Sequence, residues 1–261
     1  MHIKTYRTHQ ITTKDSLVQV IDAYVPKLKE QSILVITSKI ISLCEGSIVS
    51  KEEIESKKVL VQELADAYLN DENEKTNPYS IQLTIKNHML IPSACIDESN
   101  GNGTYVLCPK NTQQSAIFIW EHIRNRDKIQ ELGILITDSY PLPMRRGVIG
   151  ISLGWCGFKP LYNYIGKHDC FGAPLHVTMR NNLDGLAAAA VFCMGEGNEQ
   201  TPFAVMTNAP KIEFQLEPPV DAEIQERSIP IHEDLYAPLL KNTNWIFKNQ
   251  HTNFNLKKGP K

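Results

Sequence analysis

The sequence predicts an α/β (α+β) protein with mixed sheets, and two patterns carry this prediction. Residues 33–36 and 134–136 are short, purely apolar runs of the kind found in fully buried strands. Residues 15–29 and 113–132 instead place apolar side chains three and four positions apart, which is the spacing of a helix with one buried face. Strands and helices therefore both contribute to the expected core.

The other elements follow from the same two periods. In chain order they are a helix at 51–69, a polar loop at 70–78, strands within 81–91, a strand at 104–108, a helix at 185–194 and a strand at 203–206. Asn182 or Asp184 is expected to cap the helix at 185–194, and Gly195 to end it. The Gly-rich, aromatic stretch 147–172 predicts bulges and tight turns.

The C-terminal part is less regular and suggests a boundary near residue 210. We expect residues 1–210 to form one domain and residues 211–261 to form a C-terminal extension that ends in a frayed basic tail.

Composition excludes some classes of protein. The chain has 261 residues, is 42% hydrophobic and 21% charged, and has a net charge of −2, which gives no sign of nucleic-acid binding. Neither a signal peptide nor a membrane-spanning run is recognisable, so we expect no membrane association. The cysteines contain no Cys-x-x-Cys pair, so neither a zinc site nor a disulfide is expected, and a cytoplasmic location is the simplest. They are Cys44, Cys95, Cys108, Cys156, Cys170 and Cys193.

The stretch 133–150 combines chemistry that suits phosphate. Asp138 and Ser139 follow its apolar run, and a strand ending there delivers a carboxylate and a hydroxyl to the rim of a sheet, where α/β proteins bind ligands. Arg145 and Arg146 come next, and a guanidinium binds oxyanions at two points. A strand, a turn and a solvated Arg pair is the alternative interpretation.

Two further acids make a metal site conceivable. Asp97 follows an apolar segment, and Glu196 follows the glycine that ends a predicted helix. Mg²⁺ binds a few carboxylates and leaves other positions to water and phosphate oxygens. The alternatives are an Asx-type turn at Asp97 and a solvated helix end at Glu196.

Nucleotide motifs are mostly missing. There is no Gly-x-x-x-x-Gly-Lys-Ser/Thr loop and no complete Gly-x-Gly-x-x-Gly fingerprint. Ser38 and Ser42 follow the first buried strand and could contact phosphate, although such hydroxyls more often bond backbone.

Taken together, three motifs give a specific resemblance. They are Ile-Asp-x-Ser-Asn at 96–100, Thr-Asp-Ser at 137–139 with Arg-Arg-Gly-Val-x-Gly at 145–150, and Met-Gly-Glu-Gly at 194–197. The chain resembles the coenzyme F420-0:γ-glutamyl ligase family, most closely its folate-metabolism γ-glutamate ligase branch. This resemblance implies a two-lobed F420 ligase-like fold over residues 1–210 and an intertwined homodimer.

The resemblance also implies a GTP-dependent ligase. In this family a substrate carboxylate is thought to take a phosphoryl group from GTP, after which the amine of L-glutamate attacks the acyl phosphate. Such chemistry depends on positioning and charge neutralisation, which Mg²⁺ or Mn²⁺ and Arg supply.

Each site residue is carried over by its position in these motifs. The resemblance assigns Asp97, Asp138, Ser139 and Glu196 to the metal ions. It assigns nucleotide contacts to Ser38, Ser42, Asn100, Met194, Gly195 and Glu196. Asp97, Asp138 and Arg146 are the expected catalytic residues.

Three departures from the family pattern bear on activity and acceptor. Leu43 stands where a Lys is common, and Cys95 stands where Gly is usual. Tyr140, Pro141 and Leu142 replace a segment that carries an Arg in the F420 branch, and this more apolar wall suits a flat pterin through stacking. A folate-type acceptor is therefore the first hypothesis. The alternatives are the deazaflavin F420-0 as acceptor, a two-metal phosphohydrolase, and a nucleotide-binding protein without ligation.

Overall fold

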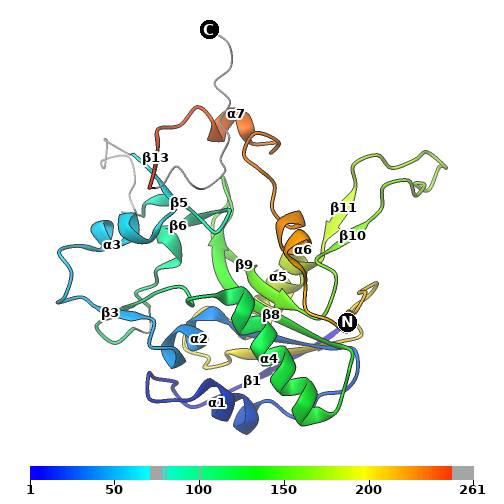
Figure 1. The fold of residues 1–261 in the computed structure, drawn as a ribbon, viewed down its shortest axis with the longest axis horizontal. Coiled ribbons are helices and arrows are strands. Elements are labelled where there is room, and N and C mark those ends of the chain that lie inside the picture. The colour runs from blue at the N-terminus through cyan, green and yellow to red at the C-terminus, as the bar shows by residue number, and fades with distance from the viewer. Residues whose placement is uncertain (71–78, 80, 100, 249–261) are drawn as a thin grey trace. The chain divides into compact units, whose positions relative to one another are not determined.

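The chain folds into two compact units in the computed structural model, which describes residues 1–70, 79, 81–99 and 101–248. Unit 1 contains Met1–Ser47 and Pro109–Glu223, and unit 2 contains Ile48–Cys108 and Ile224–Lys261 (Figure 1). The described residues form several sheets and seven α-helices, so the predicted mixed α/β class is confirmed. Each unit is made of two separate stretches of sequence, and the expected boundary near residue 210 stays a prediction.

Unit 1 is built on a five-stranded mixed sheet. Its order is β1 (His2–Tyr6), β12 (Phe203–Thr207), β2 (Ser32–Thr37), β8 (Leu132–Pro141) and β9 (Val148–Cys156). Only the central pair β2–β8 is parallel within this sheet. The two apolar runs recognised in the sequence are therefore neighbours at the centre of unit 1.

Helices cover both faces of this sheet. Ile134, Leu135 and Ile136 are all fully buried, and since successive strand residues point to opposite faces, both faces are covered. Helices α4 and α5 pack on β8 and β9, while α2 packs on β8 and contacts α1 (Figure 1). The bounds are α1 Leu17–Tyr24, α2 Ser38–Cys44, α4 Thr112–Asp127 and α5 Asn182–Met194.

Asparagine side chains begin the two long helices. The Asn111 side chain accepts a hydrogen bond from the Gln114 N–H at α4, and Asn181 accepts one from the Asp184 N–H at α5. Neither Asn182 nor Asp184 is thus the cap of α5, contrary to the prediction. The helix begins three residues earlier than expected because Asn181 satisfies its free N–H groups from outside the first turn.

A two-stranded arm also belongs to unit 1. Strands β10 (Leu161–Asn163) and β11 (Met179–Asn181) pair, and residues 164–178 project beyond them (Figure 1). The arm exposes large apolar side chains, among them Phe171 and Val177, which are 93% and 82% exposed.

Unit 2 contains a four-stranded antiparallel sheet and a separate strand pair. The sheet order is β13 (Trp245–Phe247), β4 (Ala67–Leu69), β5 (Leu83–Lys86) and β6 (Met89–Pro92). The pair is β3 (Ile48–Ser50) and β7 (Thr104–Val106). Helix α3 (Lys57–Leu64) closes a small core that also contains Ala94, Ile96 and Tyr105.

The expected helix at 51–69 is wrong at both ends. Ser56 accepts a hydrogen bond from the Val59 N–H and starts α3 six residues late, and residues 67–69 are the strand β4. The apolar side chains at 67–69 reflect strand pairing with β5, which helical spacing alone does not reveal. The loop expected at 70–78 lies almost entirely outside the described residues.

Two short helices follow in the C-terminal part, α6 (Asp221–Glu226) and α7 (Ala237–Leu240). The expected frayed tail lies outside the described residues. Among the helices that the structure describes, none has the length and apolarity that crossing a membrane requires.

Candidate active site

The parallel pair at the centre of unit 1 brings two predicted site residues together. Thr37 of β2 pairs with Thr137 of β8, and the next residues along the chain are Ser38 and Asp138. Open α/β sheets bind ligands beyond the carboxyl ends of parallel strands, at the point where the chain leaves the sheet. Ser38 begins α2 at this point, so the two residues share the expected edge.

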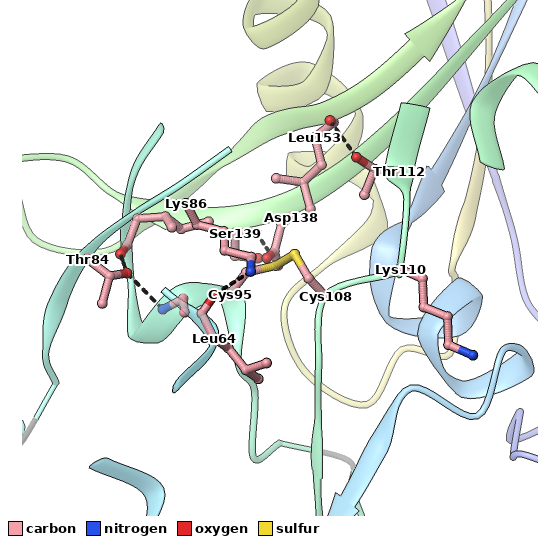
Figure 2. Close-up of a disulfide and its surroundings, with 12 residues drawn as sticks. Leu64, Thr84, Lys86, Cys95, Cys108, Lys110, Thr112, Asp138, Ser139 and Leu153 are labelled. Atoms are coloured by element: carbon pink, nitrogen blue, oxygen red, sulfur yellow. Dashed lines mark hydrogen bonds between the residues drawn. A yellow bond between two sulfur atoms is a disulfide. The ribbon is translucent and has the colours of Figure 1, made fainter. Parts of the chain in front are cut away.

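A β-bulge lies directly before Asp138. Ile136 pairs with Gly154 and Thr137 with Ser152, so β9 has one extra residue, Leu153. The Leu153 carbonyl accepts a hydrogen bond of 3.0 Å from the Thr112 hydroxyl at the start of α4 (Figure 2). The Ser152 N–H donates to the Asp184 carboxylate of α5 at 2.9 Å. Bulges re-aim side chains next to active sites, and the first turns of two helices hold this one.

The strand does not end at Asp138, contrary to the prediction. Strand β8 continues to Pro141 because β9 pairs with it as far as Val148. Asp138 is half-buried, and its Oδ1 accepts a hydrogen bond of 2.8 Å from the Ser139 N–H. The Asp138 carboxylate therefore lies on β8 just beyond the last residue that pairs with β2, and not on a loop.

Ser139 links Asp138 to the end of α5. Its hydroxyl donates a hydrogen bond of 2.6 Å to Oε2 of Glu196. Glu196 is exposed, as the alternative interpretation expects, but this contact brings its carboxylate to Ser139, the residue after Asp138. Ser139 thus contacts two other predicted metal ligands of unit 1, Asp138 through its backbone N–H and Glu196 through its hydroxyl.

The loop after α5 depends on an acid that sequence reasoning missed. Glu199 accepts a hydrogen bond of 2.8 Å from the Gly197 N–H, and its carboxylate lies 2.5 Å from where a Cβ on Gly195 would be. Gly195 also has φ +85°, so only glycine fits there. The signal in the sequence was the Gly-Glu-Gly spacing, which predicts a tight backbone turn. Met194 is buried, and its carbonyl accepts a hydrogen bond from the Thr201 hydroxyl.

The two predicted serines of α2 are buried. Ser38 is 5% exposed and Ser42 is fully buried. Within the described residues the Ser42 hydroxyl oxygen has no hydrogen-bond partner. Their contacts with a nucleotide stay predictions.

The β8–β9 hairpin carries the Arg pair at its tip. Arg145 and Arg146 are exposed, and the turn is closed by the Arg145 N–H donating to the Leu142 carbonyl at 3.2 Å. Gly147 has φ +91°, which the turn requires. Tyr140 is half-buried at the base of this tip, and burial raises the pKa of its phenol.

Asp97 lies in unit 2, in a segment with its own local structure. Its backbone N–H and carbonyl both bond Val106, at 2.9 and 2.8 Å. Its two carboxylate oxygens accept hydrogen bonds from the Ser99 N–H and hydroxyl, at 2.7 and 3.0 Å, so the Asx-type turn is present. Asn100 lies outside the described residues.

Two lysines hold the neighbouring acid. Glu98 forms ion pairs with Lys51 at 3.0 Å and Lys57 at 2.7 Å. The pKa of the Glu98 carboxyl is lowered most by the hydrogen bond from Lys57, and next by the hydrogen bond from Lys51. Both ammonium groups also lie over the Tyr105 ring, at 5.0 and 6.0 Å from its centroid.

A disulfide joins the segment that contains Asp97 to the segment of its pairing partner Val106. Cys95 and Cys108 are bonded, with their Cα atoms 5.5 Å apart (Figure 2). The expectation that the cysteines form no disulfide is therefore wrong. These residues are partners across the Asp97–Val106 pairing, and only the antiparallel register brings them together.

The donor set in unit 1 fits the metal that the family resemblance implies. Asp138, Ser139 and Glu196 offer two carboxylates and a hydroxyl, which are the oxygen ligands of Mg²⁺ and Mn²⁺. Within the described residues, no three His, Cys, Asp or Glu side chains are grouped so as to hold a metal ion. The metal site as a whole, with Asp97, stays a prediction.

Comparisons with known proteins agree on one family. The model of the F420-0:Gamma-glutamyl ligase family matches residues 5–208. Relatives named coenzyme F420:L-glutamate ligase include one from Methanococcus maripaludis, 32% identical over 75% of this chain and 82% of the relative. One from Archaeoglobus fulgidus is 32% identical over 74% and 81%, and one from Methanopyrus kandleri is 29% identical over 73% and 80%. The chain therefore belongs to the F420-0:γ-glutamyl ligase family.

Proposed function

We propose that this protein is a GTP- and divalent-metal-dependent ligase that joins L-glutamate to its acceptor through a γ-glutamyl amide bond. The observation that carries the proposal is the cluster of Asp138, Ser139 and Glu196 at the end of the parallel strand pair. The cluster lies within the residues that the family model matches.

In this proposal the site residues hold a cation that neutralises the negative charge of the GTP phosphates. A bound Mg²⁺ or Mn²⁺ supplies positive charge that offsets the phosphates. Asp138, Ser139 and Glu196 would hold the cation, and the Ser139 hydroxyl also orients the Glu196 carboxylate by its hydrogen bond. Asp97 is the fourth proposed ligand, and Arg146 is proposed to bind the transferred phosphoryl group or the acceptor carboxylate.

The names of the relatives favour the deazaflavin F420-0 as acceptor over the folate-type pterin that the sequence analysis expects. The expectation of a pterin rests on Tyr140, Pro141 and Leu142 as a stacking wall. Tyr140 is half-buried, so its ring offers less free surface than the sequence suggests. We therefore put F420-0 first and keep the pterin as the second candidate.

A homodimer and a cytoplasmic location complete the proposal. Support for a dimer comes from apolar side chains exposed on unit 1. Met144 at the β8–β9 tip is fully exposed, and the arm exposes Phe171 and Val177. Apolar surface of this kind is typical of interfaces.

One assay tests the activity and the acceptor together. The purified protein is incubated with GTP, Mn²⁺ and L-glutamate, and with either F420-0 or dihydropteroate. Glutamate incorporation is measured by mass spectrometry, and phosphate release is measured in parallel. Incorporation into F420-0 supports the proposal, and incorporation into the pterin alone moves the acceptor to the second candidate.

The same assay separates the other classes. Phosphate release without glutamate or acceptor indicates a phosphohydrolase. GTP binding without phosphate release indicates a protein that binds nucleotide and no longer ligates. Either result contradicts the proposed ligase.

A further inference from the structure

We propose that Cys95 and Cys108 form a reversible redox site that fixes the position of Asp97. Closure of the disulfide would hold the carboxylate in place, and its reduction would release it. This inference rests on the proposed function only where Asp97 acts as a metal ligand. We call this restraint of Asp97 by the Cys95–Cys108 disulfide the clamp. It is a property of unit 2 and is testable without substrates.

The disulfide lies close to Asp97 and to its partner Val106 in the sequence. Cys95 precedes Asp97 by two residues, and Cys108 follows Val106, the backbone partner of Asp97, by two residues. The disulfide therefore crosses the same antiparallel pair that carries Asp97. It closes a loop of sequence that contains Asp97, Glu98 and Ser99, so a shift of the Asp97 backbone has to strain this loop.

The backbone that leads to Cys95 adopts an uncommon conformation. Ser93, Ala94 and Cys95 have φ angles of 51°, 51° and 66°, three successive left-handed residues without a glycine. Such residues persist only when the surrounding structure holds them. At the start of the turn the Ala94 N–H donates to the Thr84 hydroxyl at 2.9 Å, and the Ser93 N–H donates to the Gln82 carbonyl at 2.8 Å. At its end, next to Asp97, the disulfide is the covalent restraint.

The hydrophobic core cluster around α3 in unit 2 contains neither cysteine. Ala94, Ile96 and Tyr105 pack with α3, and the ion pairs of Glu98 reach Lys51 and Lys57, which lie outside the loop that the disulfide closes. Reduction thus removes one tie without removing the support of the fold. The expected result is a local opening around Asp97 and not unfolding.

The chemistry balances with an external dithiol or disulfide. A dithiol supplies two electrons and two protons, the Cys95–Cys108 bond becomes two thiols, and the sulfurs of the dithiol join in a disulfide of their own. The reverse reaction needs a disulfide oxidant such as oxidised glutathione. Both cysteines are half-buried, so small reagents of this kind have access to the bond.

Hydrogen exchange of the protein without metal or substrate tests the clamp. The oxidised protein, made with oxidised glutathione, is compared with the protein reduced by dithiothreitol. The readout is the exchange rate of the Asp97 and Val106 amides. We expect reduction to speed their exchange about tenfold or more, while the amides of β8 are unchanged.

Two variants control the result. Cys108→Ser cannot form the bond, so its Asp97 amide exchanges at the rate of the reduced protein with or without dithiothreitol. Cys170→Ser removes an exposed cysteine of the arm and keeps the wild-type response. Mass spectrometry of alkylated peptides checks that the 95–108 pair alone changes state.

Mn²⁺ titration extends the test to the proposed metal site. After removal of dithiothreitol under nitrogen, the reduced protein is expected to bind Mn²⁺ about tenfold more weakly than the oxidised protein. Equal amide exchange in both states, or no 95–108 disulfide after oxidation, overturns the inference. A redox-dependent exchange rate in a protein without ligase activity leaves the clamp standing and contradicts the proposed function instead.

Discussion

The two proposed metal aspartates are held in opposite ways. Asp138 follows the parallel β2–β8 pair, in a strand buried on both faces, and contacts between distant parts of the chain set its position. Asp97 sits in a short segment of unit 2, fixed by Val106, Ser99 and the disulfide, all within residues 95–108. The position of Asp138 thus depends on a sheet, and the position of Asp97 depends on contacts that are closer in the sequence. Their sensitivity to mutation and to conditions should differ accordingly.

Removing either carboxylate is the largest expected effect. Asp138→Asn and Asp97→Ala should each lower glutamate incorporation by about 10³-fold or more, because each takes a negative ligand from the proposed cation site. Both proteins should stay folded, which circular dichroism checks, although Asp97→Ala also loses the two hydrogen bonds from Ser99. Glu217→Gln, which changes an exposed acid outside the site, is the control. Activity like that of the wild type in either variant would retire that residue as a metal ligand.

The framework around Asp138 is open to a test of stability. In Gly157→Ala the new Cβ would lie 1.9 Å from the Leu132 carbonyl oxygen, at φ +83°. It would also meet Trp120, whose indole N–H donates to that carbonyl at 2.8 Å. We expect a loss of about 3 kcal/mol or more in the free energy of unfolding.

Gly166→Ala is the matched control for that substitution. Gly166 has φ +81°, and a Cβ added to it would meet no atom within 4 Å, so only the backbone contribution of about 1 kcal/mol applies. Chemical denaturation of both variants measures the difference. Equal losses would show that close packing at Gly157 contributes nothing.

The arginines at the hairpin tip should differ more modestly. Arg146→Lys is expected to raise KM for the nucleotide or the acceptor about tenfold, because Lys cannot replace a bidentate fork. Arg145→Lys should be close to silent, since Arg145 closes the turn through its backbone, which the substitution leaves in place. Steady-state kinetics distinguish them, and two silent substitutions would make the pair a solvated surface feature.

The smallest expected effect is the pH response of the segment around Asp97. Lys57 and Lys51 lower the pKa of Glu98 below its ordinary value of 4.5. Its contribution to stability is therefore present above the unfolded pKa and is lost as pH falls through the lower folded pKa. Because the Glu98 side chain is 43% exposed, we expect less than about 1 kcal/mol.

The check is acid unfolding of Glu98→Gln beside the wild type. The variant should lose less stability than the wild type between about pH 5 and pH 3. Asp221→Asn, an exposed acid at the start of α6, controls for general charge loss. If Glu98→Gln and Asp221→Asn lose the same amount of stability over this pH range, the lysine contacts at Glu98 do not stabilise the fold.

What the sequence reveals follows the same contrast. Apolar runs and helical spacing located β2, β8, α4 and β12, since burial leaves a periodic mark on each segment separately. Asp138 and Ser139 could be named because they follow such a run.

Features that depend on two segments at once were hidden. The bulge at Leu153 depends on the register of β8 against β9, and the Cys95–Cys108 bond depends on the pairing across Val106. Glu199 accepts a hydrogen bond from the backbone of a loop, and loops lack the regular spacing of apolar residues that reveals helices and strands. The strand β4 was read as helix because three residues are too few to show a period of two.

The discontinuous make-up of unit 2 has a consequence for synthesis on the ribosome. Strand β4 pairs with β5 soon after both emerge, but its other partner, β13, is translated only after all of unit 1. Until then β4 is a bare sheet edge, which can recruit strands from other nascent chains. A chain truncated near residue 210 would lack β13 and leave the edge of β4 unpaired. The C-terminal strand is therefore expected to protect that edge from aggregation.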